Sequence, residues 1–159
     1  MKRWIVLGAA LLSGCSGMPG FRDNGQAVEV TEIARTLHCG TEGEAARLSV
    51  LADRVAVQDW QQQRGVELSG NPLPQGPFAL VEMGQRPSGG YGIAISRVAT
   101  VHRDVLILHA TFVSPAADAI TSQALTAPCV LVSLPAQGYA DVQVVDQQGS
   151  LRARSADTP

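Results

Sequence analysis

Lysine is almost absent from this 159-residue chain, in which Lys2 is the only one, and aromatic residues make up just 4 %. The formal net charge is −2. Because no cluster of basic residues is present, the chain lacks the electrostatic footprint of a nucleic-acid-binding protein, and we expect no nucleic acid partner. So few aromatic side chains also argue against a glycan site built from stacked rings.

No hydrophobic run reaches membrane-spanning length, and the run from Trp4 to Leu12 is too short for a stable transmembrane helix. Since Lys2 and Arg3 precede it, the run is typical of the apolar region of a secretory signal. Leu12-Ser13-Gly14-Cys15 follows and resembles the lipobox of bacterial lipoproteins. That resemblance implies a signal peptide over residues 1–14 and a lipid anchor, with its palmitate-type acyl chains, at Cys15. The alternative is a plain signal peptide with an incidental cysteine.

Several acyl chains together hold a protein on a membrane. Ser16 follows the cysteine, and its resemblance to the lipoprotein sorting pattern implies the outer membrane, with the domain facing the periplasm. Residues 15–26 have linker composition and are expected to form the tether. Residues 27–148 have the length of one globular domain, and 149–159 are expected to be a flexible tail.

Short stretches of alternating hydrophobic residues, separated by turn signals, indicate a β-rich domain. One short helix is expected at about 54–64, with Asp53 as its N-cap and Ala56, Val57 and Trp60 on its buried side. A longer helix starting at Thr41 is the competing interpretation. The fold class is therefore α+β and β-rich, a twisted antiparallel sheet, sandwich or partly closed barrel with one helix packed on it. Strands are expected over residues 28–37, 46–52, 78–84, 91–102, 105–114, 129–134 and 139–146.

The segment from Gly84 to Gly92 lies between two of these strands. Pro87 fixes its own φ, and Gly89 and Gly90 can adopt positive φ, so a hairpin connection is the simplest interpretation. The segment is longer than a tight turn requires. We therefore expect it to be the main functional surface as well.

Cys39 and Cys129 form an even pair in an oxidising compartment, which predicts a disulfide between the N-terminal strand and the strand that begins at Cys129. In the chain-entropy model, closing a loop of about 90 residues stabilises the fold by roughly 4 kcal/mol. Two buried free thiols are the alternative. A metal site at His38-Cys39 lacks the paired spacing of structural zinc sites, so we expect no metal and no cofactor.

Catalytic motifs are missing from the segments that could carry them. Ser88-Gly89-Gly90 is not a nucleophile elbow, and no Lys-Ser/Thr pair ends the glycine-rich stretch as a phosphate loop requires. His102 and His109 flank the expected Arg103-Asp104 turn and are interpreted as ordinary hairpin histidines. The sequence therefore predicts a protein that is not an enzyme.

Two ordered blocks carry a further resemblance. Residues 81–92 (VEMGQRPSGGYG), with the alternating residues after them, and residues 126–135 (TAPCVLVSLP) resemble the C-terminal domain of the PrcB family, over about 78–135. Ser88 stands where that family usually has threonine, and Cys129 where it often has an aromatic residue. The resemblance implies a secreted protein or lipoprotein, and the family's named member associates with and stabilises a surface protease complex.

We therefore expect a non-catalytic lipoprotein that binds another envelope protein, such as a protease or an assembly factor. Tyrosine and arginine tend to carry binding energy at interfaces, which directs attention to the central segment. The alternatives are a small-ligand or glycan-binding lipoprotein with a pocket, and a protease-inhibitor-like module. The expected contact residues are Arg86, Ser88, Gly89, Gly90 and Tyr91.

Overall fold

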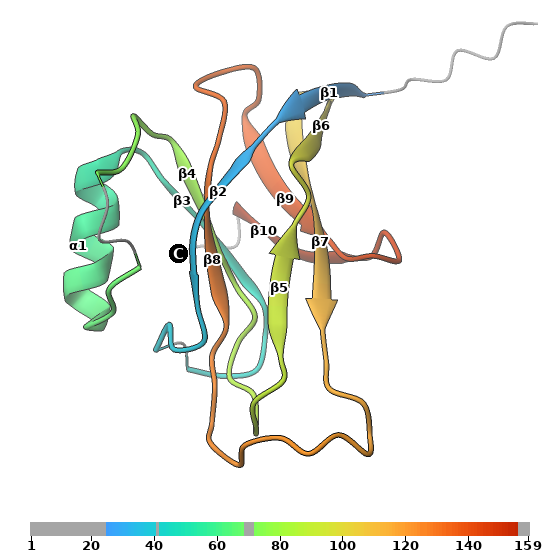
Figure 1. The fold of residues 1–159 in the computed structure, drawn as a ribbon. Helices are drawn as coiled ribbons and strands as arrows, with labels where there is room; N and C mark the ends of the chain where they lie inside the picture. Colours follow the sequence, from blue (N-terminus) through green and yellow to red (C-terminus); the bar gives the residue numbers. More distant parts are fainter. Residues whose placement is uncertain (1–24, 41, 69–71, 156–159) are drawn as a thin grey trace, which may run out of the picture.

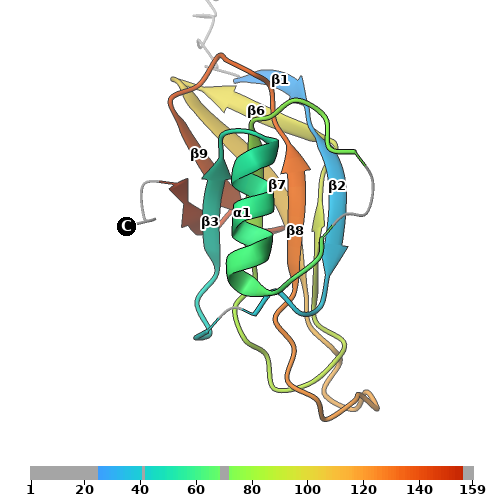
Figure 2. The same ribbon diagram turned by 90° about the vertical axis from the view of Figure 1, so that its left-hand side faces the viewer.

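The computed structural model describes residues 25–40, 42–68 and 72–155 as ten strands and one helix. The expected signal peptide, Cys15 and nearly all of the tether lie outside the described residues, as do residues 156–159. Two sheets pack face to face, and the helix α1 covers the outer face of the smaller sheet (Figures 1 and 2). The elements are β1 (Gln26–Glu29), β2 (Thr31–Thr36), β3 (Arg47–Leu51), α1 (Arg54–Arg64), β4 (Phe78–Glu82), β5 (Gly92–Ile95), β6 (Val98–His102), β7 (Val105–Val113), β8 (Cys129–Ser133), β9 (Asp141–Val145) and β10 (Leu151–Arg154).

The smaller sheet has the strand order β2-β8-β4-β3 and is antiparallel throughout. All five residues of β4 are buried because both faces of this sheet are covered. Ala79 and Val81 face the larger sheet, whereas Phe78 and Leu80 face the helix.

The larger sheet has the order β1-β6-β7-β9-β10, and β5 also pairs with β7. Strands β5 and β6 lie end to end along the same edge of β7, because β6 pairs with its first residues and β5 with its last. The pairing of β7 with β9 is parallel, and the other pairings in this sheet are antiparallel. This arrangement confirms the β-rich α+β class and selects the open sandwich among the expected architectures.

The helix forms where the sequence predicts it. The side chain of Asp53 accepts a hydrogen bond from the Ala56 backbone N–H at 2.9 Å, and Gly65 ends the helix with φ 63°. Val57 is fully buried, and Trp60 packs half-buried against the same cluster. The competing long helix is wrong, because residues 47–51 form β3. No helix in the described ranges is long and apolar enough to cross a membrane.

The disulfide between Cys39 and Cys129 is present, as expected. Their Cα atoms are 6.0 Å apart, and both residues are buried in the apolar cluster beneath α1. The bridge therefore joins the segment after the edge strand β2 to the start of the central strand β8.

Three expectations about the strands are wrong. The single strand over 28–37 is two strands in different sheets, with the change of sheet at Val30 and an irregularity in pairing after Glu32. The strand over 91–102 is interrupted between β5 and β6. The tail is not flexible directly after Gly149, because β10 pairs with β9 and buries Ala153.

Of the two turns expected from the sequence, one forms and the other does not. Arg103 and Asp104 adopt φ 47° and 65° between β6 and β7, which confirms a tight hairpin with both central residues in the left-handed region. The hairpin expected at 84–92 is wrong. Strand β4 pairs with β3 and β8, while β5 pairs with β7, so this segment crosses from one sheet to the other.

Candidate functional site

The segment from Gly84 to Gly92, which crosses from one sheet to the other, begins in close contact with the backbone of residues 43–45. Gly84 has φ 84°, and a Cβ atom there would lie 2.5 Å from the carbonyl oxygen of Glu44. The next residue, Gln85, donates its backbone N–H to the Gly43 carbonyl at 2.7 Å. Only glycine fits the first position, because it has both the conformational freedom and the small size that are needed.

The segment is then held against the connection between β7 and β8. Arg86 and Thr126 form an antiparallel bridge, and the Thr126 hydroxyl donates to the Ser88 carbonyl at 2.8 Å. Gly89 donates its N–H to the carbonyl of Ser122 at 2.9 Å. These contacts order a surface loop that lies outside the ten strands.

The Arg86 side chain connects this segment to neighbouring parts of the chain. Its Nη2 donates to the carbonyl oxygens of Met83 at 2.6 Å and Glu44 at 3.1 Å. Its Nε is buried and has no hydrogen-bond partner among the described residues. The guanidinium carbon lies 5.9 Å from the centre of the Tyr91 ring, within the range of a cation–π contact.

Tyr91 lies between two hollows and lines both. One is a mostly apolar groove of about 410 Å³ between β2 and β5. The other is a more polar cavity of about 270 Å³ on the side of Arg86. The residue is half-buried and packs against the core between the sheets. It is therefore anchored and still reachable from outside.

The groove follows from the change of sheet at Val30. The chain leaves the larger sheet there, after β1, and β2 forms the outer strand of the smaller sheet, whereas β5 belongs to the larger one. No other strand of the described part of the chain pairs with the outer edge of β2 or of β5. Leu37 and Val113 line the groove and remain 46 % and 44 % exposed. The result is an open apolar slot between two sheet edges.

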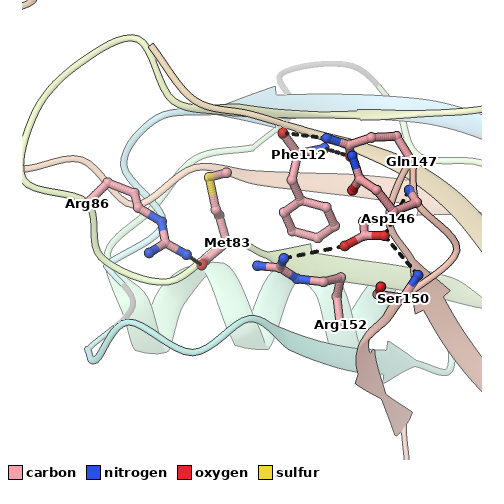
Figure 3. Close-up of polar contacts among 8 residues, drawn as sticks. Met83, Arg86, Phe112, Asp146, Gln147, Ser150 and Arg152 are labelled. Carbon is pink, nitrogen blue, oxygen red and sulfur yellow. Dashed lines mark hydrogen bonds and ion pairs between the residues drawn. The ribbon is translucent and has the colours of Figure 1, made fainter. Parts of the chain in front are cut away.

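The cavity brings together distant parts of the chain, as Figure 3 shows. Arg152 of β10 places its guanidinium carbon 4.7 Å from the centre of the Phe112 ring. Gln147 accepts a hydrogen bond from the Phe112 N–H at 3.1 Å and donates one to its carbonyl at 3.3 Å. The turn between β9 and β10 is thereby fixed to the end of β7.

Asp146 organises this turn. Its Oδ1 accepts from the backbone N–H groups of Ser150 at 2.8 Å and Gln148 at 3.0 Å, and its Oδ2 lies 3.5 Å from Nη1 of Arg152. These hydrogen bonds, above all the one from Ser150, hold the pKa of the Asp146 carboxyl below its ordinary value. The side chain is therefore ionised at neutral pH.

The structure brings two of the five expected contact residues together, Arg86 and Tyr91. The Ser88 hydroxyl turns back to the Gly89 carbonyl at 3.1 Å, Gly89 is buried, and Gly90 is exposed. The sequence marked none of Asp146, Gln147 and Arg152 as site residues. Asp146 is the last residue of the strand expected over 139–146 but begins a turn instead, and Gln147 and Arg152 follow it. The alternation of Leu151, Ala153 and their polar neighbours was the available signal for β10.

The two hairpin histidines do not face each other. His102 pairs with Val105, and the His109 ring lies 3.0 Å from the Thr100 hydroxyl. The described residues contain no group of three or more metal-ligating side chains.

Comparison with known protein families gives a match to part of the chain. The family described as PrcB C-terminal matches residues 78–135, which run from the start of β4 to just past β8. This match confirms the resemblance over that segment. No curated protein and no solved structure matches the chain.

Proposed function

Since residues 78–135 match the PrcB C-terminal family, we propose that this protein is a non-catalytic subunit that binds and stabilises an envelope protein assembly. By the same resemblance the assembly is a protease complex. Arg86 and Tyr91 form the centre of the binding surface, with Gly90 and the rims of the groove around them.

The main structural support for this proposal is the position of Tyr91. A half-buried tyrosine beside an arginine, on a loop already ordered by backbone hydrogen bonds, loses little conformational entropy when a partner binds. The apolar groove next to it offers surface that a partner can cover. Such a combination is typical of a protein-binding hot spot.

We also propose that Cys15 carries the lipid anchor and holds the domain at the periplasmic face of the outer membrane. Replacing Cys15 with alanine should move the protein from the membrane fraction to the soluble periplasmic fraction. A variant that stays in the membrane fraction after a carbonate wash would contradict this anchor.

The binding proposal is tested by mild crosslinking in intact cells, with a C-terminal tag and mass spectrometry of the captured proteins. Wild type should capture an envelope protease or an assembly factor, and Tyr91→Ala should lose it. Tyr139→Ala is the matched control. Tyr139, the other tyrosine of the chain, packs half-buried against the same core, but from the loop between β8 and β9 at the opposite end of the sandwich (Figure 1). Equal capture by wild type and both variants would refute the assignment.

The groove supports a second candidate, a lipoprotein that binds a small apolar molecule. An extract of the native protein, analysed by mass spectrometry after denaturation, should then release a bound compound. A protease-inhibitor-like module would instead lower the activity of a purified envelope protease, and it would not be a permanent subunit of a protease complex.

A further inference from the structure

The cavity beside Tyr91 carries more positive charge than its own groups balance. It is lined by two guanidinium groups, those of Arg86 and Arg152, and by one carboxylate, that of Asp146. The carboxylate already accepts two backbone N–H bonds besides its contact with Arg152. The charged side chains that line this cavity therefore sum to one positive charge, although the formal net charge of the whole chain is −2.

Arg86 is the group without a counter-ion. Within the described residues it donates to backbone carbonyls only, through Nη2, and contacts no carboxylate. Its buried Nε makes no hydrogen bond. A partly buried guanidinium without an anionic partner is unfavourable, and a ligand carrying negative charge would relieve that.

The geometry fits a small monoanion better than a phosphate. One excess positive charge matches one carboxylate, and planar guanidinium groups suit carboxylate oxygens. The cavity lining itself is mostly polar, but Tyr91 also lines the neighbouring apolar groove, which would accept a short hydrocarbon chain next to the anion. The Asp146 contact and the Phe112 ring hold Arg152 in place without surrounding it, since its side chain is 37 % exposed.

We propose that this cavity binds one carboxylate of the partner protein, supplied by its C-terminus or by an acidic side chain, between Arg86 and Arg152. The inference rests on the proposed protein-binding function and specifies its chemistry. The partner's apolar side chain next to the carboxylate packs against Tyr91 in the neighbouring apolar groove. Asp146 acts as a positioning residue that orients Arg152.

The first test uses the full chain, labelled with ¹⁵N, and N-acetyl-leucine as the carboxylate probe. Its amide, N-acetyl-leucinamide, is the uncharged control. The acid should shift the backbone resonances of Arg86, Gln147 and Arg152 saturably, and the amide should not. Arg152→Gln should weaken binding at least tenfold, whereas Arg97→Gln, which removes an exposed arginine paired with Glu29, should have no effect. Equal shifts from acid and amide, or unchanged affinity in Arg152→Gln, would overturn the site.

Arg152→Lys keeps the positive charge but removes the planar guanidinium group. It is the variant to use if Arg152→Gln fails to fold. It should bind the acid more weakly than wild type, and wild-type affinity in this variant would also count against the site.

The second test repeats the crosslinking capture with Arg152→Gln. Lost capture supports a partner carboxylate in the cavity. Capture that persists with Arg152→Gln but is lost with Tyr91→Ala overturns this inference and leaves the binding function standing. Capture that persists in both variants overturns both.

Discussion

Arg86 and Thr126 are joined by two backbone hydrogen bonds, with Arg86 N–H donating to Thr126 at 2.7 Å and Thr126 N–H donating to Arg86 at 3.0 Å. They lie in different connections, one between β4 and β5 and the other between β7 and β8. Both connections lie within the segment that matches the PrcB C-terminal family. The bridge makes them one ordered surface at the same end of the sandwich, as Figure 1 shows.

Thr126→Val should loosen this surface. Valine keeps the shape of the buried threonine but removes the hydroxyl that donates to the Ser88 carbonyl at 2.8 Å. We expect a loss of about 1 kcal/mol of unfolding free energy, measured by urea denaturation, and faster amide hydrogen exchange at Gly89. The exposed Thr111→Val is the control and should leave both unchanged. Wild-type exchange rates in Thr126→Val would show that the hydroxyl does not order the loop.

Gly84→Ala should destabilise the protein strongly, by more than about 1 kcal/mol. The residue has positive φ, and the added Cβ would meet the backbone of Glu44 and Ala45. Gly92→Ala is the matched control in the same segment, since a Cβ there meets nothing within 4 Å. Thermal melting of the two variants should therefore differ, and similar melting temperatures would contradict the close approach at Gly84.

Replacing both Cys39 and Cys129 with alanine should lower the unfolding free energy by about 2–4 kcal/mol, because the bridge joins residues 90 apart in sequence. Urea denaturation of wild type in the presence of a reducing agent should give a similar loss. If the reductant destabilises wild type while the double variant is as stable as oxidised wild type, the effect comes from the reductant and not from the bridge.

Asp146 should contribute stability that depends on pH. Its folded-state pKa is lowered by the backbone N–H groups of Ser150 and Gln148, so the contribution is complete above the unfolded pKa of about 3.9. It disappears as the pH falls from there through the folded pKa. Asp146→Asn should be less stable than wild type at pH 7, with the difference closing at pH 2.

Urea midpoints at pH 7, 5, 3 and 2 measure this difference. The exposed Asp118→Asn should give no comparable pH dependence. A gap between wild type and Asp146→Asn that stays constant over the whole range would show that the ionised carboxylate is not the stabilising form.

Local chemistry was sufficient for the elements whose stabilising contacts are close in sequence. Asp53 and Gly65 set the ends of α1 through capping at its own termini, and Arg103-Asp104 forms its turn from backbone conformations of adjacent residues. The pairing of Cys39 with Cys129 also followed from the sequence, through the number of cysteines and the expected compartment.

Tertiary structure alone decided which sheet each strand joins. Val28, Val30 and Ile33, separated by polar residues, predict one strand over 28–37, yet β1 pairs with β6 and β2 with β8. The cavity beside Tyr91 likewise depends on β10 pairing with β9, which brings Arg152 near a segment some sixty residues earlier in the chain. Alternation specifies that a strand has a buried face, but its partner is set by hydrogen bonds and packing between residues distant in sequence.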